Sequence, residues 1–329
     1  MRVTHFYREP RKTGLSIEGI FQTVKADLKG EVDIVDFYCD GTQSRYKNVK
    51  RAKKAATDVN HITGDVNFLA MGLKGKNTIL TVHDLGFYEN PVHSRLVKTV
   101  YELFWFRLPL RSVDLVTVVS DFTRQKLMHY FRFPADRVRI VPDPVKPVFR
   151  WTEQRQPNER PVVLMLGTGK HKNLDNLIAA SQGLDVHLDI VGWPAADELQ
   201  RLKEYNISHT VYNGLTDEQV YERYVACDIL YIASHYEGFG MPIVEAQAVG
   251  RPVITGNTGA MLEVGRESAL LVDPTKPEET REAIQALAEP ELRAEMIAVG
   301  KANAAKYDHR IVAQQYKVIY EELAQKKHR

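Results

Sequence analysis

The chain has 329 residues, enough for two domains of about 150 residues each. Hydrophobic residues make up 44% of it and charged residues 26%, which is typical of a soluble globular protein. The N-terminus is short and charged, no apolar run is long enough to span a bilayer, and the two cysteines, Cys39 and Cys227, lie far apart; we therefore expect a cytoplasmic protein without signal peptide, membrane span or structural metal.

The net charge of +2 is unevenly distributed along the chain. Residues 1–150 contain 25 Lys+Arg against 16 Asp+Glu, a net of +9, whereas residues 151–329 contain 19 against 26, a net of −7. The densest stretch, 45–54, carries six positive charges and no negative one. It is either an ordinary solvated helix face or a surface for an anionic membrane or acceptor. No nucleic-acid motif accompanies it, so we expect no nucleic-acid partner.

The first half alternates short β-rich runs with helical stretches, the pattern of an α/β fold with parallel sheets. We expect strands at 3–7, 32–38, 77–82, 115–119 and 138–141, and helices near 16–28, 94–108 and 121–131. The segment 103–108 mixes aromatic residues with flanking cations. It is either a core helix with basic ends or an amphipathic helix that enters a membrane interface.

Three prolines between 142 and 147, followed by the polar segment 150–161, predict a linker between two domains. Beyond it we expect strands at 162–166, 186–191, 210–212, 229–232, 253–255 and 269–272, with helices between them. The predicted domains are thus 1–149 and 162–309, followed by a helix at 310–325. Two such domains in tandem leave a cleft between the carboxyl ends of their sheets, where ligands of these folds bind.

A glycine turn, Gly167-Thr-Gly169, follows the strand at 162–166 and leads to Lys170 and Lys172. It resembles parts of two nucleotide-binding motifs. A dinucleotide fingerprint, however, requires glycine where Lys172 stands, and a P-loop requires a Gly-Lys-Ser/Thr sequence that does not follow. Both interpretations are weak.

The most informative segment is 234–250, Ser-His-Tyr-Glu-Gly-Phe-Gly-Met-Pro-Ile-Val-Glu-Ala-Gln-Ala-Val-Gly. Gly238 and Gly240 predict a turn, and Pro242 suits the first position of a helix that ends at Gly250. The helix is apolar almost all round, which predicts that it is buried.

Two carboxylates, Glu237 and Glu245, flank the beginning of this helix. A buried charge at Glu245 needs hydrogen-bond donors, a cation or a polar ligand. The free N–H groups of a helix N-terminus favour an anion, so the pair suits a ligand that is part phosphate and part polyol. The alternative is that Glu245 is paired inside the core and Glu237 is a solvated loop residue.

The string from Glu237 to Glu245 closely resembles the E-x7-E motif of retaining glycosyltransferases of family 4, which have the GT-B fold. Further segments resemble family elements: Thr81-Val-His-Asp-Leu85 with Pro91, Val119–Arg124, Ile140–Val145, and Gly256–Ala260 with Glu263 and Asp273-Pro274. The resemblance covers most of the chain. It implies two Rossmann-like domains that face each other across a cleft, with the helix at 310–325 packing back on the first.

The resemblance also implies roles for individual residues of the donor site. Glu237 would bind hydroxyls of the transferred sugar near the reacting face, and Glu245 the ribose hydroxyls of the nucleotide. The backbone N–H groups that follow Gly238, those of Phe239, Gly240 and Met241, would bind the sugar or the phosphate. Lys172 would be the phosphate-binding lysine. Thr168 stands where many members have arginine, so Lys170 is a candidate substitute.

Two candidates lie in the first half. By resemblance, His83 would contact the donor sugar or the acceptor near the reacting carbon, as an acid/base or polar partner; the alternative is a structural histidine at a strand end. Gly14 stands where the family has a flexible glycine loop near the diphosphate, with one glycine rather than two.

The chain contains no Asp-x-Asp sequence, which many sugar transferases use to hold a metal. We therefore expect a metal-independent enzyme without a cofactor, in which cations and helix N-termini stabilise the leaving diphosphate. The predicted reaction transfers a sugar from a UDP- or GDP-linked donor to a glycan or lipid-linked acceptor, with peripheral contact at the inner membrane surface. The alternatives are a GT-B epimerase or phosphorylase and a nonenzymatic nucleotide-sugar sensor.

Overall fold

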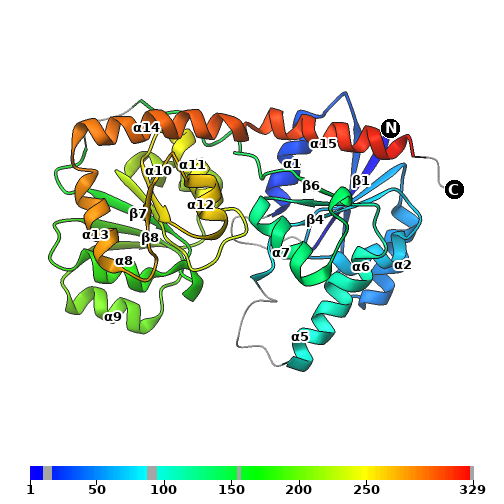
Figure 1. The fold of residues 1–329 in the computed structure, drawn as a ribbon, viewed down its shortest axis with the longest axis horizontal. Coiled ribbons are helices and arrows are strands. Elements are labelled where there is room, and N and C mark those ends of the chain that lie inside the picture. The colour runs from blue at the N-terminus through cyan, green and yellow to red at the C-terminus, as the bar shows by residue number, and fades with distance from the viewer. Residues whose placement is uncertain (10–16, 87–94, 154–156, 327–329) are drawn as a thin grey trace. The chain divides into compact units, whose positions relative to one another are not determined.

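The computed structural model describes residues 1–9, 17–86, 95–153 and 157–326. The chain divides into two compact units, Met1–Pro144 with His309–Arg329, and Val145–Asp308. Each unit is built on a six-stranded parallel sheet. Figure 1 shows helices packed against each sheet. The predicted α/β fold class is therefore confirmed.

The chain enters the second unit at Val145, before the segment 150–161 that we expected to be a linker. Phe149 is buried, and its ring meets that of Tyr224 edge to face at 5.6 Å. The Lys301 ammonium lies 4.1 Å from the Trp151 ring centroid. These contacts place the first residues of the expected linker on the second unit.

The first unit holds six strands, β1 (Arg2–Tyr7), β2 (Asp33–Tyr38), β3 (Val59–Ile62), β4 (Thr78–Val82), β5 (Leu115–Val118) and β6 (Val138–Ile140). Its helices are α1 (Ile17–Asp27), α2 (Arg45–Ala55), η1 (Asn67–Leu69), α3 (Ala70–Leu73), α5 (Arg95–Tyr101), the π-helical η2 (Glu102–Arg107), α6 (Leu108–Leu110), α7 (Asp121–Phe131), η3 (Ala135–Arg137) and α15 (His309–Ala324).

The sheet of the first unit has the order β2-β1-β3-β4-β5-β6, in which β3 was not predicted from the sequence. The strand is short and carries two polar side chains, Asn60 and His61, inside the fold. Both are satisfied there: Asn60 donates to the carbonyls of Thr57 and Lys76, and His61 Nδ1 lies 2.8 Å from the Tyr320 hydroxyl. Hydrogen bonding thus allows a strand that lacks an apolar pattern.

Helix α15 packs against α1 on one face of this sheet. The Tyr320 hydroxyl contacts His61 and also lies 2.9 Å from His5 Nε2 on β1. Helix α15 is therefore part of the core of the first unit. On this helix Ile311 is 48% exposed, whereas Ala313 is buried.

The second unit holds β7 (Val162–Leu166), β8 (His187–Val191), β9 (Ser208–Tyr212), β10 (Ile229–Ile232), β11 (Val253–Gly256) and β12 (Leu270–Val272). Its helices are η4 (Lys170–Lys172), α8 (Leu174–Ser181), α9 (Ala196–Glu204), α10 (Asp217–Ala226), α11 (Met241–Val249), α12 (Gly259–Gly265), α13 (Pro277–Ala286), α14 (Pro290–Ala304) and η5 (Ala305–Tyr307). Among the described helices of both units, none has the length and apolar composition needed to span a bilayer.

Candidate active site

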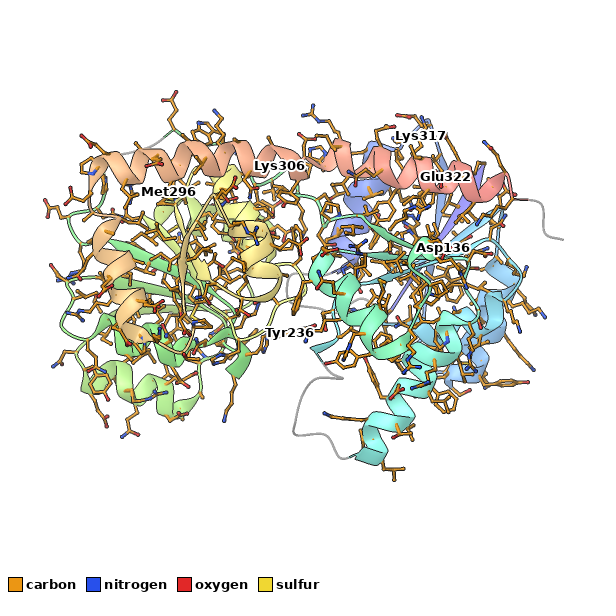
Figure 2. The ribbon with its side chains drawn as sticks, in the orientation of Figure 1. Asp136, Tyr236, Met296, Lys306, Lys317 and Glu322 are labelled. Atoms are coloured by element: carbon orange, nitrogen blue, oxygen red, sulfur yellow. The ribbon has the colours of Figure 1, made fainter. Side chains whose placement is uncertain are left out.

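The sheet of the second unit has the order β12-β11-β10-β7-β8-β9, so the chain runs outward in both directions from the pair β7 and β10. In open parallel sheets of this kind, ligands bind at the carboxyl ends of the two strands where the order reverses. The two loops at that point are the glycine turn after β7 and the loop after β10, which contains Glu237 and, as Figure 2 shows, Tyr236. Topology therefore brings together the two segments that the sequence singled out.

The turn after β7 holds Lys172 in a fixed place. Gly167 has φ +86°, and a Cβ there would lie 3.1 Å from Lys172 Cε, so glycine allows the lysine stem to cross the turn. The next residue, Asn173, donates to the Ala233 carbonyl at 3.0 Å and to the Pro274 carbonyl at 2.7 Å. Asn173 thereby ties the turn to the end of β10 and positions Lys172.

Lys172 and Glu237 form an ion pair across the switch point. Lys172 Nζ lies 2.7 Å from Glu237 Oε1, and the Ser234 hydroxyl donates to the same oxygen at 2.7 Å. The two side chains are only 20% and 13% exposed, so the pair is partly desolvated. The sequence suggested separate roles for these residues, whereas the structure joins them in one charged unit that can meet both phosphate and hydroxyl groups.

The N-terminus of α11 lies directly after this loop. Gly240 has φ +94° at the N-cap, and Pro242 is in the first turn, one residue after the start of the helix at Met241 rather than at its first position as predicted. Phe239 is 5% exposed and meets Tyr307 edge to face at 5.3 Å, so its side chain belongs to the core and only its backbone can serve a ligand. Gly238 and Met241 complete the turn around this helix end, which favours a bound anion.

Glu245 lies one turn inside α11 and is 1% exposed. Its Oε2 accepts a hydrogen bond of 2.8 Å from the Tyr224 hydroxyl. Burial raises the pKa of Glu245 to about 7, although the Tyr224 hydrogen bond and the positive charge of Lys146 oppose this effect. The charged form is therefore poorly supported by the protein alone, and a ligand hydroxyl that donates to the carboxylate would stabilise it.

The other two residues of the turn have different environments. Thr168 stands where an arginine was expected, and its hydroxyl accepts a 2.8 Å hydrogen bond from the Trp193 backbone N–H, which links the turn to the loop after β8. Lys170 begins the short η4 helix and is exposed. Its proposed substitution for the arginine remains a prediction.

His83 follows β4 in the first unit, and both of its ring nitrogens are engaged. Nε2 lies 2.8 Å from the Thr63 carbonyl oxygen, and Nδ1 lies 3.4 Å from Asp143 Oδ1. Burial by itself would lower the pKa of His83, but the charge and hydrogen bond of Asp143, helped by the Thr63 carbonyl, raise it to about 9. His83 is thus a paired cation at neutral pH, an arrangement that offers no vacant nitrogen for a general base.

Two elements of the sequence prediction, Gly14 and Pro91, lie outside the described residues. Within the described part of the chain, no group of three or more His, Cys, Asp or Glu side chains is arranged to hold a metal ion. Sequence reasoning passed over the positioning residues Asn173, Ser234 and Asp143. For Asn173 the signal was its place beside Lys172, and for Asp143 it was a carboxylate set between two prolines.

Residues 39–148 match the family described as "Glycosyltransferase Family 4", and residues 150–303 match "Glycosyl transferases group 1". The chain belongs to glycosyltransferase family 4. The E-x7-E segment and the Lys172 turn both lie inside the second match.

Two curated relatives are similar to this chain over part of their length. The chain is 27% identical to O-antigen chain mannosyltransferase B of Escherichia coli, over 60% of this chain and 58% of that protein. It is 31% identical to D-inositol 3-phosphate glycosyltransferase of Acidothermus cellulolyticus, over 59% and 49%. The matches thus span about half the length of these relatives.

Two solved structures resemble the whole chain. Sucrose-phosphate synthase from Thermosynechococcus elongatus has a TM-score of 0.78 at 19% identity, covering 98% of this chain and 99% of that one. Anabaena HepE, in complex with UDP and glucose, has a TM-score of 0.76 at 16% identity, covering 97% and 99%. At these identities the likeness concerns the fold, which is GT-B as predicted.

Proposed function

We propose that this family 4 member is a retaining, metal-independent glycosyltransferase that moves a sugar from a UDP- or GDP-linked donor to a glycan or lipid-linked acceptor. The observation that carries the proposal is the Lys172–Glu237 ion pair of 2.7 Å, set beside the N-terminus of α11 and the buried Glu245. One cation, one helix end and two carboxylates match a ligand made of a diphosphate, a ribose and a sugar.

In the proposed reaction the bond between the sugar C1 and the diphosphate oxygen breaks, and the acceptor oxygen bonds to C1 on the same face. The acceptor proton passes to the departing diphosphate. Lys172 and the first turn of α11 would stabilise the negative charge that develops on the leaving group. Glu237 and Glu245 would accept hydrogen bonds from the sugar and ribose hydroxyls, and no cofactor besides the donor would be needed.

The role of His83 differs from a free acid or base. Held between Asp143 and the Thr63 carbonyl, it would present a positively charged ring edge rather than exchange a proton. We propose that the first unit, with its basic surface, binds the acceptor and contacts a membrane peripherally.

A donor screen tests this function. Thermal shift with UDP, GDP, ADP and their sugars would identify the nucleotide, beginning with UDP-glucose and GDP-mannose because HepE was crystallised with UDP and the E. coli relative is a mannosyltransferase. Slow release of nucleotide from one donor is expected. Binding without release from any donor would favour the nonenzymatic sensor, and a rearranged donor sugar the epimerase.

Paired lysine variants locate the diphosphate. Lys172→Ala should weaken diphosphate binding and slow turnover by about 100-fold, since removal of one charge-stabilising donor costs this much. Lys170→Ala, in the same turn, should have the smaller effect if it merely lies near the site. Wild-type kinetics for Lys172→Ala would remove this lysine from the mechanism, and equal losses would make Lys170 the substitute for the missing arginine.

A further inference from the structure

The continuous helix formed by α5, η2 and α6, residues 95–110, has two apolar faces. Its inner face packs on the core of the first unit: the Trp105 ring lies 5.6 Å from that of Phe68, and the buried Phe106 stacks on Phe131 at 4.6 Å. Its outer face is 39–75% exposed and carries Leu96, Val100, Leu103 and Phe104. Figure 1 shows α5 extending away from the sheet of its own unit.

These four exposed residues, which we name the apolar stripe, recur at helical spacing on one side of the helix. The inner face packs as expected for the core helix that the sequence suggested. The apolar stripe takes no part in that packing. Contiguous exposed apolar side chains mark a surface for a partner or a membrane. The π-helical turn at Glu102–Arg107 is a further irregularity of a kind often found at functional sites.

A cavity rich in arginine lies at the end of the same helix. It has a volume of about 280 Å³ and is lined by Leu110, Pro134, two aromatic side chains, Phe131 and Phe133, and four arginines, Arg107, Arg111, Arg132 and Arg137. Its described lining contains no carboxylate. Arg137 is fixed by the Asp114 carbonyl at 3.1 Å and lies over the Phe133 ring, and Arg107 pairs with Glu102.

The other two arginines, Arg111 and Arg132, have no ion-pair partner among the described residues, and both are exposed. Two exposed arginines at a cavity lined by apolar side chains and two further arginines would attract an anionic group of phosphate size. The cavity is distinct from the donor site, which lies in the second unit.

The basic helix α2 extends this positive surface. Its residues 45–54 carry six positive charges, and Arg45 lies 4.7 Å from the Trp105 ring centroid, which joins α2 to the inner face of the stripe helix. Lys47, Lys50, Lys53 and Lys54 are all exposed. Positive charge therefore lies next to the helix that carries the stripe, at α2 on its inner side and at the arginine cavity at its end.

We propose that this face of the first unit docks on an anionic phospholipid bilayer, with the apolar stripe entering the interface and a lipid phosphate bound in the arginine cavity. Apolar side chains flanked by lysine and arginine are what an anionic bilayer surface requires, because the chains bury in its acyl boundary while the cations meet its headgroups. A soluble anion would need only the arginines and would leave the stripe in water.

The inference locates the membrane contact of the proposed function but is independent of the transfer reaction. Donor binding and nucleotide release report on the second unit, whereas vesicle binding reports on the stripe and the cavity. If vesicle binding fails, donor binding and nucleotide release can still be measured, and the reverse also holds.

Sedimentation with vesicles tests the proposal on the full chain. Vesicles of phosphatidylcholine mixed with phosphatidylglycerol should bind the protein at least about tenfold more tightly than phosphatidylcholine alone, with strong dependence on salt. Leu103→Ser with Phe104→Ser should weaken binding by about 100-fold, because two side chains no longer enter the interface. Arg111→Gln with Arg132→Gln should weaken it by about tenfold and reduce the salt dependence.

A matched control lies on α15, where Ile311 and Val318 are 48% and 52% exposed. Ile311→Ser with Val318→Ser should leave vesicle binding unchanged, and the thermal midpoint of each variant shows that it is folded. Equal binding to both vesicle types, or wild-type binding by the stripe variant, would overturn the proposal. So would calorimetric binding of glycerol phosphate that requires Arg111 and Arg132 in a protein that does not bind vesicles.

Discussion

Glu245 in the second unit is buried and His83 in the first is largely buried, and their surroundings have opposite effects on the charged forms of the two groups. At Glu245 burial dominates and raises the pKa to about 7, so the carboxylate is disfavoured despite Tyr224 and Lys146. At His83 burial is outweighed by Asp143 and the Thr63 carbonyl, and the pKa rises to about 9, so the cation is favoured.

This difference in pairing indicates which of the two groups has a structural role and which can bind a ligand. His83 has its counter-ion and its acceptor within the fold, so its charge stabilises the first unit without a ligand. Among the described residues Glu245 has one hydrogen-bond donor, the Tyr224 hydroxyl, so a further donor from a ligand would stabilise its charged form. A buried group whose charge the fold leaves unsupported is the better marker of a binding site.

The largest effect should come from Asp143→Asn, which removes the counter-ion of His83. We expect a loss of about 3 kcal/mol in the free energy of unfolding at pH 6, near the lower end for a broken buried pair, since the imidazole can release its proton. The folded pKa, about 9, lies above the ordinary 6.5, so the stabilisation is complete below pH 6.5 and is lost as pH rises through 9. Urea unfolding across that range measures it.

The control for this prediction is Asp136→Asn, which changes an exposed carboxylate of the same unit, labelled in Figure 2. Its unfolding free energy should follow that of the wild type at every pH. If Asp143→Asn also follows the wild type, the pairing of His83 contributes nothing and the contrast with Glu245 disappears.

Glu245→Gln should have the next largest effect, of opposite sign. The folded pKa of about 7 exceeds the ordinary 4.5, so the wild type loses stability as pH rises through 7. The variant avoids this loss and should be about 2 kcal/mol more stable at pH 8, while binding nucleotide more than about tenfold more weakly. Denaturation and calorimetry at pH 8 check both; Glu222→Gln, an exposed change on α10, should alter neither. A variant that binds nucleotide normally would contradict the ribose assignment.

The sequence predicted much of the second unit because its signals are local. A few neighbouring residues are enough to predict the turn at Gly238, the helix from Pro242 and the lysine after Gly167. The family resemblance then implied their roles. The Lys172–Glu237 pair was not predicted because it joins loops that lie 65 residues apart, and only the strand order brings them together.

The first unit was less predictable because its polar residues are satisfied by distant partners. His83 pairs with Asp143 from a segment expected only to lead into a linker, and His61 depends on Tyr320 near the chain end. Buried polar residues of this kind hide a strand such as β3 from any apolar pattern. They also make a histidine at a strand end indistinguishable from a catalytic one until its partners are known.

A smaller effect is expected in the pH dependence of nucleotide affinity. If a ribose hydroxyl donates to the Glu245 carboxylate, binding requires the deprotonated form, and affinity should fall by up to about tenfold, or about 1.4 kcal/mol, for each pH unit below 7. Calorimetry in buffers of different ionisation enthalpy should show proton release on binding near pH 6. Affinity that is flat from pH 5 to 8, or proton uptake, would show that Glu245 does not meet the ligand as a carboxylate.

The smallest effect should come from Tyr224→Phe, which removes a hydroxyl that donates to Glu245 while keeping the ring that packs on Phe149. At pH 8, where the carboxylate is charged, we expect a loss of about 1 kcal/mol, and less at pH 5, where the hydrogen bond is to a neutral acid. In a cycle with Glu245→Gln this pH difference should vanish, because the amide carries no charge. A loss that is equal at both pH values would mean that Tyr224 only packs, and that burial alone sets the pKa of Glu245.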